Sequence, residues 1–337
     1  MSNNTPVDET WPMVEEAVMR LFGDIAAGQS AETEEHTAVA PRLDELGWAD
    51  IVGQYPIDAD RVLFRAQGQS LAQTDCLDRV MLAELSPLPL RGATRVVLPA
   101  ASDGYTPRSD SSQVSGIVLG PLVPGERLVV PVAGTMGTVS IGVVDGDELV
   151  SERLNTFDAS TYWTSVRGPL TGPLTEASTE WNRAIAAAHR SLATESVAIA
   201  REILRIAIDQ VTVRAQYGTP IGAFQSPRHA LAQAHAQLEG ADALVTEAWM
   251  FGGRLPAQAA KAAAGRATRG VADVALQVCG AIGLTAEHPL HRYVGRAFQI
   301  DALAGSYHQL ERGLADRVFD IYAPDRALPS MMAWHRN

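Results

Sequence analysis

Two stretches of the chain place polar side chains beside Gly- or Pro-marked breaks between expected helices. Residues 214–232 read R-A-Q-Y-G-T-P-I-G-A-F-Q-S-P-R-H-A-L-A, and residues 277–283 read Q-V-C-G-A-I-G. A guanidinium is a permanently charged, forked donor that suits phosphate oxygens, and side-chain amides add further donors. Glycines let a ligand approach the backbone closely. The polar groups at these breaks could therefore gather around one extended anionic ligand; they are Arg214, Gln216, Gln225, His229 and Gln277.

The two stretches resemble the C-terminal helical domain of acyl-CoA dehydrogenases. That family carries R-x-Q-F-G-x-P-I-x-x-F-Q-x-x-x-H-x-L-A, then Q-x-x-G-G-x-G, a basic helix and E-G-T. Many spaced identities are more specific than a lone glycine pattern. Tyr217 replaces the usual Phe and Ala281 the usual second Gly. The matching residues are Arg214, Gln216, Gly218, Pro220, Ile221, Phe224, Gln225, His229, Leu231, Ala232, Gln277, Gly280 and Gly283.

The resemblance implies a role in binding FAD. In the family, these Arg, Gln and aromatic residues reach the ADP part of the FAD held by a neighbouring subunit. By this resemblance the cofactor-binding residues are Arg214, Gln216, Tyr217, Gln225, Gln277 and Gly280. In the alternative interpretation, Arg214 only compensates the dipole at its helix end, and Gln277 is ordinary polar surface. Phe224 and His229 are expected to serve packing or an interface.

The carboxylate base of the family is missing at its usual position. The reaction needs a base that removes the proton next to the thioester. In many members this is the Glu of E-G-T, and counting from Pro289 and Arg292 places Ala304 there. A second family position, before an Arg at the start of the long helix, reads Ala-Ala-His-Arg at 187–190. No catalytic residue is therefore predicted, and His189 and Glu195 are expected to be surface, interface or packing residues.

The part of the family's β domain that holds the flavin ring is not visible either. The place of the family's T-E-P-x-x-G-S-D segment reads P-A-A-S-D-G-Y at 99–105, which does not match. A Trp-Thr-Ser triplet at 163–165 resembles the family's W-I-T, but it lies late in the domain. We interpret it as ordinary strand residues.

The expected fold class is multi-domain α+β. Residues 1–90 predict a degenerate version of the family's N-terminal helical domain. Its expected elements are a helix from Trp11 to Gly28, a short helical piece at 43–48, an ordinary loop at 53–58 and a helix at 71–85. Residues 91–172 predict an antiparallel, β-barrel-like domain with strands at 96–98, 116–119, 127–132, 138–144 and 148–154, and Asp145-Gly146 as a hairpin cue.

Residues 173–337 predict a four-helix bundle. Its long helix carries Leu192, Ile199, Ile203, Ile206 and Val213 on one face, and the Ala-rich stretch 257–282 favours close helix packing. Ser226-Pro227 is typical of a helix start, with Ser as the N-cap. The broad apolar faces suit an oligomer interface.

Composition narrows the possible partners and locations. The 337 residues carry a net charge of −12, which argues against a nucleic-acid partner. The two cysteines form no framework, which favours a reduced, cytoplasmic setting. Residues 1–10 lack the pattern of a signal peptide, and no stretch is long and apolar enough to span a membrane.

The hypothesis from the sequence is a non-catalytic subunit of a heteromeric acyl-CoA dehydrogenase. The chain resembles the short β-type subunits of α2β2 enzymes of bacterial steroid catabolism, which implies a catalytic partner subunit, an acyl-CoA substrate and an electron-transferring flavoprotein. One alternative is a homomeric active dehydrogenase with Glu195 or Glu247 as an unusual base. The other is a flavin-free scaffold or regulatory protein.

Overall fold

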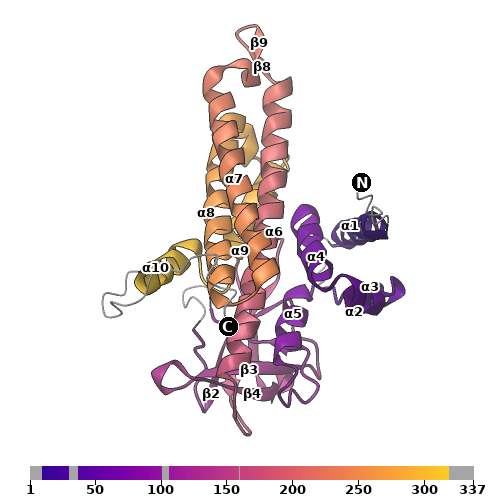
Figure 1. The fold of residues 1–337 in the computed structure, drawn as a ribbon, viewed down its shortest axis with the longest axis vertical. Coiled ribbons are helices and arrows are strands. Elements are labelled where there is room, and N and C mark those ends of the chain that lie inside the picture. Colours follow the sequence, from indigo (N-terminus) through magenta and orange to yellow (C-terminus); the bar gives the residue numbers. More distant parts are fainter. Residues whose placement is uncertain (1–9, 30–36, 101–105, 159, 319–337) are drawn as a thin grey trace, which may run out of the picture.

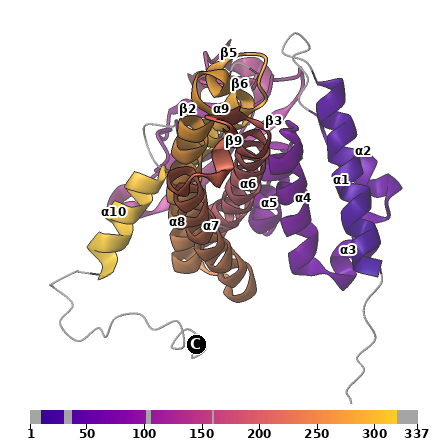
Figure 2. The ribbon, with the colours of Figure 1, turned by 90° about the horizontal axis from the view of Figure 1, so that it is seen from above.

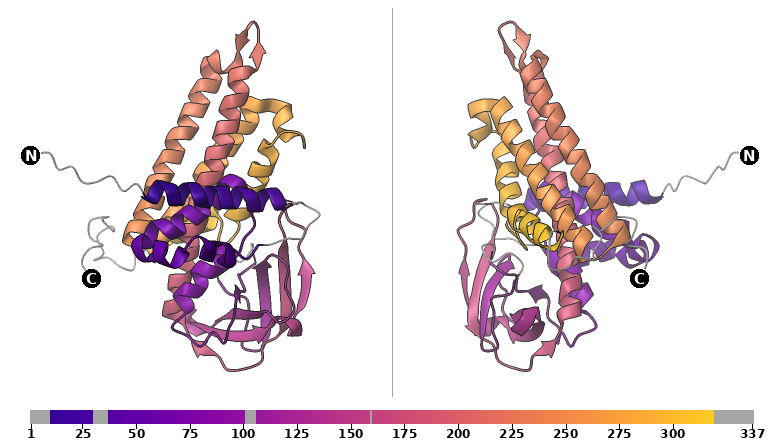
Figure 3. Two further views of the ribbon diagram at one scale, coloured as in Figure 1. Left: turned by 90° about the vertical axis from the view of Figure 1, so that its right-hand side faces the viewer. Right: turned by 60° about the vertical axis from the view of Figure 1, so that its left-hand side comes forward.

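The computed structural model describes residues 10–29, 37–100, 106–158 and 160–318. Helices, then strands, then long helices follow one another along the chain, which confirms the predicted fold class (Figure 1). The strands lie at one end of the long helices (Figure 3). The short N-terminal helices lie beside the long helices.

Among the described residues, five helices form the N-terminal part: α1 (Thr10–Gly28), α2 (Ala40–Glu45), α3 (Trp48–Gln54), α4 (Pro56–Ser70) and α5 (Cys76–Leu85). Val18, Phe22 and Ile25 form the buried face of α1, which packs on α4. Seen from above, α4 and α5 lie between α1 and the long helices (Figure 2).

Two predictions in this region were wrong. The expected loop at 53–58 is mostly helical, because only Tyr55 separates α3 from α4. Pro56 starts α4, where its missing amide costs nothing. The helix expected at 71–85 begins at Cys76, since Leu71 takes a left-handed conformation (φ 61°) that ends α4.

In the described part of the chain, seven strands form two small sheets. The strands are β1 (Arg95–Val96), β2 (Gln113–Leu119), β3 (Arg127–Ala133), β4 (Val139–Asp145), β5 (Val150–Arg153), β6 (Trp163–Pro169) and β7 (Thr175–Glu176). The orders are β1-β3-β4-β7 and β2-β6-β5, and every pair is antiparallel except β1 with β3. Val114, Val118 and Val166 of one sheet pack on Leu128 and Val130 of the other.

The Asp145-Gly146 pair does not form the expected hairpin turn. β4 pairs with β3 and β7, whereas β5 pairs with β6, so the chain passes from one sheet to the other here. The Asp145 carboxylate accepts a hydrogen bond from the Asp147 amide, and residues 146–148 form a single 3₁₀ turn. Gly146 lacks the positive φ that a type I′ hairpin needs.

The C-terminal part is a helical bundle made of α6 (Ser178–Val213), α7 (Gln225–Phe251), α8 (Arg254–Cys279) and α9 (Leu290–Asp301), followed by α10 (Tyr307–Val318). Leu192, Ile199, Ile203 and Ile206 are buried on α6 as predicted, but Val213, at its last turn, is 83% exposed. α7 begins at Gln225 with Phe224 at the N-cap and no side-chain cap, so Ser226 lies inside the first turn and is not the N-cap.

Candidate functional site

A two-stranded hairpin stands at the far end of the bundle from the sheets (Figure 1). Its strands are β8 (Ala215–Gln216) and β9 (Thr219–Pro220), and the Ile221 amide donates to the Arg214 carbonyl at 2.8 Å. Tyr217 and Gly218 form the turn with φ of 53° and 77°. Two positive φ values in a two-residue loop are the signature of a type I′ turn. Tyr217 is therefore held at the tip, where it is 96% exposed.

The six residues expected to bind a partner's FAD lie at this same end of the bundle. Arg214 follows α6, Gln216 and Tyr217 belong to the hairpin, and Gln225 opens α7. α7 and α8 are antiparallel neighbours of similar length, so Gln277 and Gly280 return to the end where α7 began. All six residues are exposed. This end therefore offers a guanidinium and amides to another molecule, and their role toward FAD stays a prediction.

Ala304, which the count from Pro289 and Arg292 assigns to the position of the family's Glu, is 1% exposed. It takes a left-handed conformation with φ 51°, and Gly305 follows with φ 95°. His189 Nε2 lies 2.9 Å from the Ala304 carbonyl oxygen, to which it donates. In the loop between α9 and α10, the side chain at position 304 is therefore a buried methyl group and not a carboxylate.

A buried lysine fixes the same loop from the other side. Lys261 Nζ donates to the carbonyl oxygens of Gly305 at 2.7 Å and Asp301 at 3.0 Å. Burial lowers the pKa of Lys261 to about 8, and it lowers the pKa of His189 to about 3. Lys261 was not among the predicted residues, although a single Lys within the alanine-rich stretch 257–264 was a signal for a special role.

Glu195 lies inside the molecule, where Gln67 Nε2 donates to its carboxylate at 2.9 Å. Burial raises the pKa of Glu195 to about 7, and the nearby positive charge of Arg296 opposes that rise. The carboxylate borders a cavity of about 50 Å³, which has room for a few water molecules but not for an acyl thioester. This setting argues against Glu195 as the base of an active dehydrogenase. Glu247, the other candidate, is half-buried on α7.

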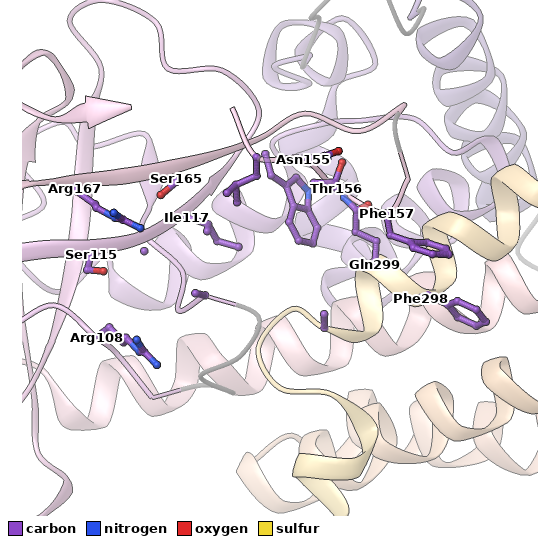
Figure 4. A pocket seen from close by; sticks show the side chains of 15 residues that line it. Arg108, Ser115, Ile117, Asn155, Thr156, Phe157, Ser165, Arg167, Phe298 and Gln299 are labelled. Atoms are coloured by element: carbon purple, nitrogen blue, oxygen red, sulfur yellow. The ribbon is translucent and has the colours of Figure 1, made fainter. Parts of the chain in front are cut away.

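A larger cavity of about 520 Å³ lies between the sheet β2-β6-β5 and α9. Arg108 and Arg167 stand at one end, and Phe157 and Phe298 at the other (Figure 4). Trp163 is a strand residue of β6, as we interpreted it, and it also lines this cavity. No sequence pattern predicted this cavity. Of the non-matching segment 99–105, residues 101–105 lie outside the described part of the chain.

Two other kinds of site are absent from the described residues. These residues include no group of three or more His, Cys, Asp or Glu residues placed to hold a metal ion. Within those residues, no helix is both long and apolar enough to cross a membrane.

Known proteins resemble the chain over most of its length. A model of the acyl-CoA dehydrogenase C-terminal domain matches residues 182–318. The acyl-CoA dehydrogenase IpdE2 of Mycobacterium tuberculosis is 27% identical over 262 residues, which is 75% of this chain and 80% of IpdE2. FadE34 of the same organism is 35% identical over 213 residues, which is 60% of this chain but only 29% of FadE34.

Two solved structures share the fold. The ChsE4-ChsE5 complex from Mycobacterium tuberculosis contains a chain with a TM-score of 0.66 and 18% identity, covering 94% of this chain and 99% of that one. A variant of the Tcur3481-Tcur3483 steroid acyl-CoA dehydrogenase gives 0.66 and 21%, with the same coverage. Residues 182–318 therefore match the acyl-CoA dehydrogenase C-terminal domain, and the chain is similar to acyl-CoA dehydrogenases over most of its length.

Proposed function

We propose that this chain is the non-catalytic subunit of a heteromeric, FAD-dependent acyl-CoA dehydrogenase, and that it acts in the cytoplasm. A catalytic subunit supplies the base, the flavin-ring site and most of the acyl site. This chain completes the binding of that subunit's FAD through Arg214, Gln216, Tyr217, Gln225, Gln277 and Gly280. The complex removes hydrogens from the α and β carbons of an acyl-CoA and passes electrons to an electron-transferring flavoprotein.

The observation that carries this proposal is the state of Ala304. By the count from Pro289 and Arg292, its methyl group takes the place of the family's base, and His189 and Lys261 bond to the surrounding loop. A carboxylate from elsewhere in the chain would need a cavity of acyl size beside it, and the cavity at Glu195 is about 50 Å³. The exposed residues at the other end of the bundle support a role in a complex.

The relatives support the heteromeric assembly and suggest the substrate class. One similar structure is a complex of two different chains, and the other is a steroid acyl-CoA dehydrogenase that pairs two differently named components. We therefore propose a CoA thioester of a bulky, steroid-derived acid as the substrate of the complex.

The test is purification of the chain alone and together with the dehydrogenase subunit encoded beside it. We expect a colourless chain alone and a yellow complex whose flavin is bleached by an acyl-CoA. A chain that binds FAD and is bleached without a partner would overturn the proposal. A colourless complex would indicate a flavin-free scaffold.

Arg214→Ala tests the role of the bundle end in the intact complex. Loss of one charged hydrogen bond costs ~1.5–3 kcal/mol, so FAD occupancy should fall at limiting FAD. Arg205→Ala is the matched control, because Arg205 is exposed on the same helix and pairs with Glu202 and Asp209. Unchanged occupancy in Arg214→Ala would remove Arg214 from the FAD site.

A further inference from the structure

A small internal cavity has a carboxyl group and a guanidinium group in its wall. Glu195 of α6 and Arg296 of α9 both line this cavity, whose volume is about 50 Å³. Glu195 Oε2 accepts the hydrogen bond from Gln67 Nε2 at 2.9 Å. Within the described residues, Glu195 Oε1 accepts no hydrogen bond, and no ion pair links Glu195 to Arg296. One oxygen of this carboxyl group is therefore available to a donor that enters the cavity.

Arg296 bonds to a different carboxylate and keeps unused donors. Its Nε donates to Asp158 Oδ2 at 2.9 Å, and both side chains are buried. Nη1 lies 3.5 Å from the Ala72 carbonyl oxygen, which is a long and weak contact. Nη2 has no acceptor in the described part of the chain. Because a guanidinium carries five N–H donors in a planar fork, Arg296 can serve a second carboxylate.

The charge of Glu195 is set by few groups. Burial raises the pKa of Glu195 to about 7, and the positive charge of Arg296 and the hydrogen bond from Gln67 oppose that rise. From α5, the thiol of Cys76 faces the same region. Burial raises the pKa of that thiol as well, so it stays neutral. Glu195 therefore changes its charge near neutral pH, while the groups around it keep theirs.

The hydrogen bonds from α7 and α8 to this part of α6 come from neutral groups. From α8, the Thr268 hydroxyl donates to the Ser196 carbonyl oxygen at 3.1 Å. From α7, Trp249 Nε1 donates to the Thr194 hydroxyl oxygen at 2.9 Å. Neither side chain titrates near pH 7. The response to a new negative charge at the cavity therefore falls to the guanidinium on α9.

Ionisation of Glu195 places two carboxylates and one guanidinium inside the molecule. Like charges in a low-dielectric interior repel each other strongly, and a cation between them lowers that repulsion. Asp158 and Glu195 then compete for Arg296. The cavity gives the guanidinium space to move, or it holds a water molecule that links the guanidinium to Glu195. Either arrangement weakens the hydrogen bond from Arg296 Nε to Asp158.

We propose that Arg296 and the small cavity form a pH-sensitive switch. Ionisation of Glu195 draws the guanidinium toward α6, and the junction between Asp158 and α9 becomes looser. Protonation of Glu195 returns Arg296 to Asp158 and tightens the junction. The switch uses residues of this chain, and it does not depend on the proposed function.

The test is hydrogen exchange of the full chain at about pH 6 and about pH 8, corrected for the intrinsic exchange rate. A group with a pKa of about 7 is ~10% ionised at the lower pH and ~90% ionised at the higher. The Asp158 amide donates to Gln299 Oε1 at 2.8 Å, and the Thr161 amide donates to the Asp158 carbonyl oxygen at 3.0 Å. We expect the protection of both amides to fall by about fivefold at the higher pH, as for the loss of one hydrogen bond.

Two variants identify the titrating group. Glu195→Gln should keep both amides at the protection of the lower pH throughout, because its side chain cannot ionise. Gln67→Met keeps the carboxyl group and removes its hydrogen bond, so the midpoint of the change should move to higher pH. Glu239→Gln is the matched control and should respond like the unmodified chain, because Glu239 is exposed and pairs with Arg201 at the surface. Circular dichroism checks that each variant is folded.

Three results would overturn the proposal. The first is equal protection of the Asp158 amide at both pH values in the unmodified chain, since the junction would then not respond to Glu195. The second is a pH response that persists in Glu195→Gln, since another group would then cause it. The third is a midpoint that does not move in Gln67→Met, which decides the question even if Glu195→Gln does not fold.

Discussion

Asp158 and Arg296 form an ion pair inside the molecule, although 138 positions separate them in the chain. Arg296 Nε donates to the Asp158 carboxylate at 2.9 Å, and both side chains are about 95% buried. The pair joins the loop before β6 to α9. Gln299 strengthens the same junction, accepting from the Asp158 amide and donating to Thr161. This junction fixes one wall of the 520 Å³ cavity against the sheet.

Arg296→Met should destabilise the chain by ~3–5 kcal/mol, because a buried charge loses its partner. The measurement is the free energy of unfolding from urea titration. Arg292→Met, an exposed position on the same helix, is the control and should change the stability by less than ~0.5 kcal/mol. If both variants unfold at the same urea concentration as the unmodified chain, the junction carries little of the stability.

Lys261→Met should cost ~2–4 kcal/mol, because the Asp301 and Gly305 carbonyl groups would lose their donor in the interior. Arg266→Met on the same helix is the comparison. Arg266 is exposed and pairs with Glu311, and such surface pairs contribute ~0–1 kcal/mol. Thermal unfolding of the two variants gives the difference, and a larger loss in Arg266→Met would contradict the role given to Lys261.

Ala304→Glu should not restore a catalytic base. The side chain would enter a buried position whose loop is already bonded to His189 and Lys261, so we expect a loss of ~2–4 kcal/mol and no acyl-CoA oxidation by the chain alone. Ala304→Gly should be neutral or stabilising by up to ~1 kcal/mol, since glycine accepts the positive φ. Dye reduction by acyl-CoA and urea unfolding measure the two effects. Turnover in Ala304→Glu would show that the loop can open to substrate.

Glu195→Gln should change how stability depends on pH. Burial raises the Glu195 pKa from 4.5 to about 7, so the native state keeps a proton that the unfolded chain releases. This contribution is complete below the unfolded pKa and is lost as pH rises through 7. The variant cannot titrate, and its stability relative to the unmodified chain should rise by on the order of 2 kcal/mol from about pH 5 to about pH 8.

Melting temperatures across that pH range provide the measurement. The titrations of His189 and Lys261 occur in both proteins and cancel in the difference. Glu239→Gln is the control, because Glu239 is exposed and paired with Arg201 at the surface. A difference between Glu195→Gln and the unmodified chain that stays constant with pH would mean that the native and unfolded states hold the Glu195 proton equally.

The order of helical and β regions followed from local patterns, because periodicity and turn residues act over short distances. The break at Tyr217-Gly218 was visible for the same reason, and the structure shows a type I′ turn there. Local patterns failed at Asp145-Gly146, where pairing with distant strands decided the path. They also failed at Leu71, where an ordinary residue ends a helix with positive φ.

In the candidate site, too, only the residues that lie close together in the sequence could be predicted. The exposed residues from Arg214 to Gln225 lie close together in sequence, so their common location could be inferred. The 520 Å³ cavity combines residues from 100 to 302, and no short pattern links Arg108, Trp163 and Phe298. Lys261 acts on carbonyl groups 40 and 44 positions away, and such backbone acceptors leave no mark in the sequence.

The hairpin at Tyr217 is complete in the single chain, since its turn and its closing hydrogen bond involve only its own residues. A contact surface that is already folded before binding does not have to become ordered when the partner binds, so little conformational entropy is lost there. Assembly through this end should therefore show a heat-capacity change that matches the buried area alone, without the additional decrease that accompanies coupled folding.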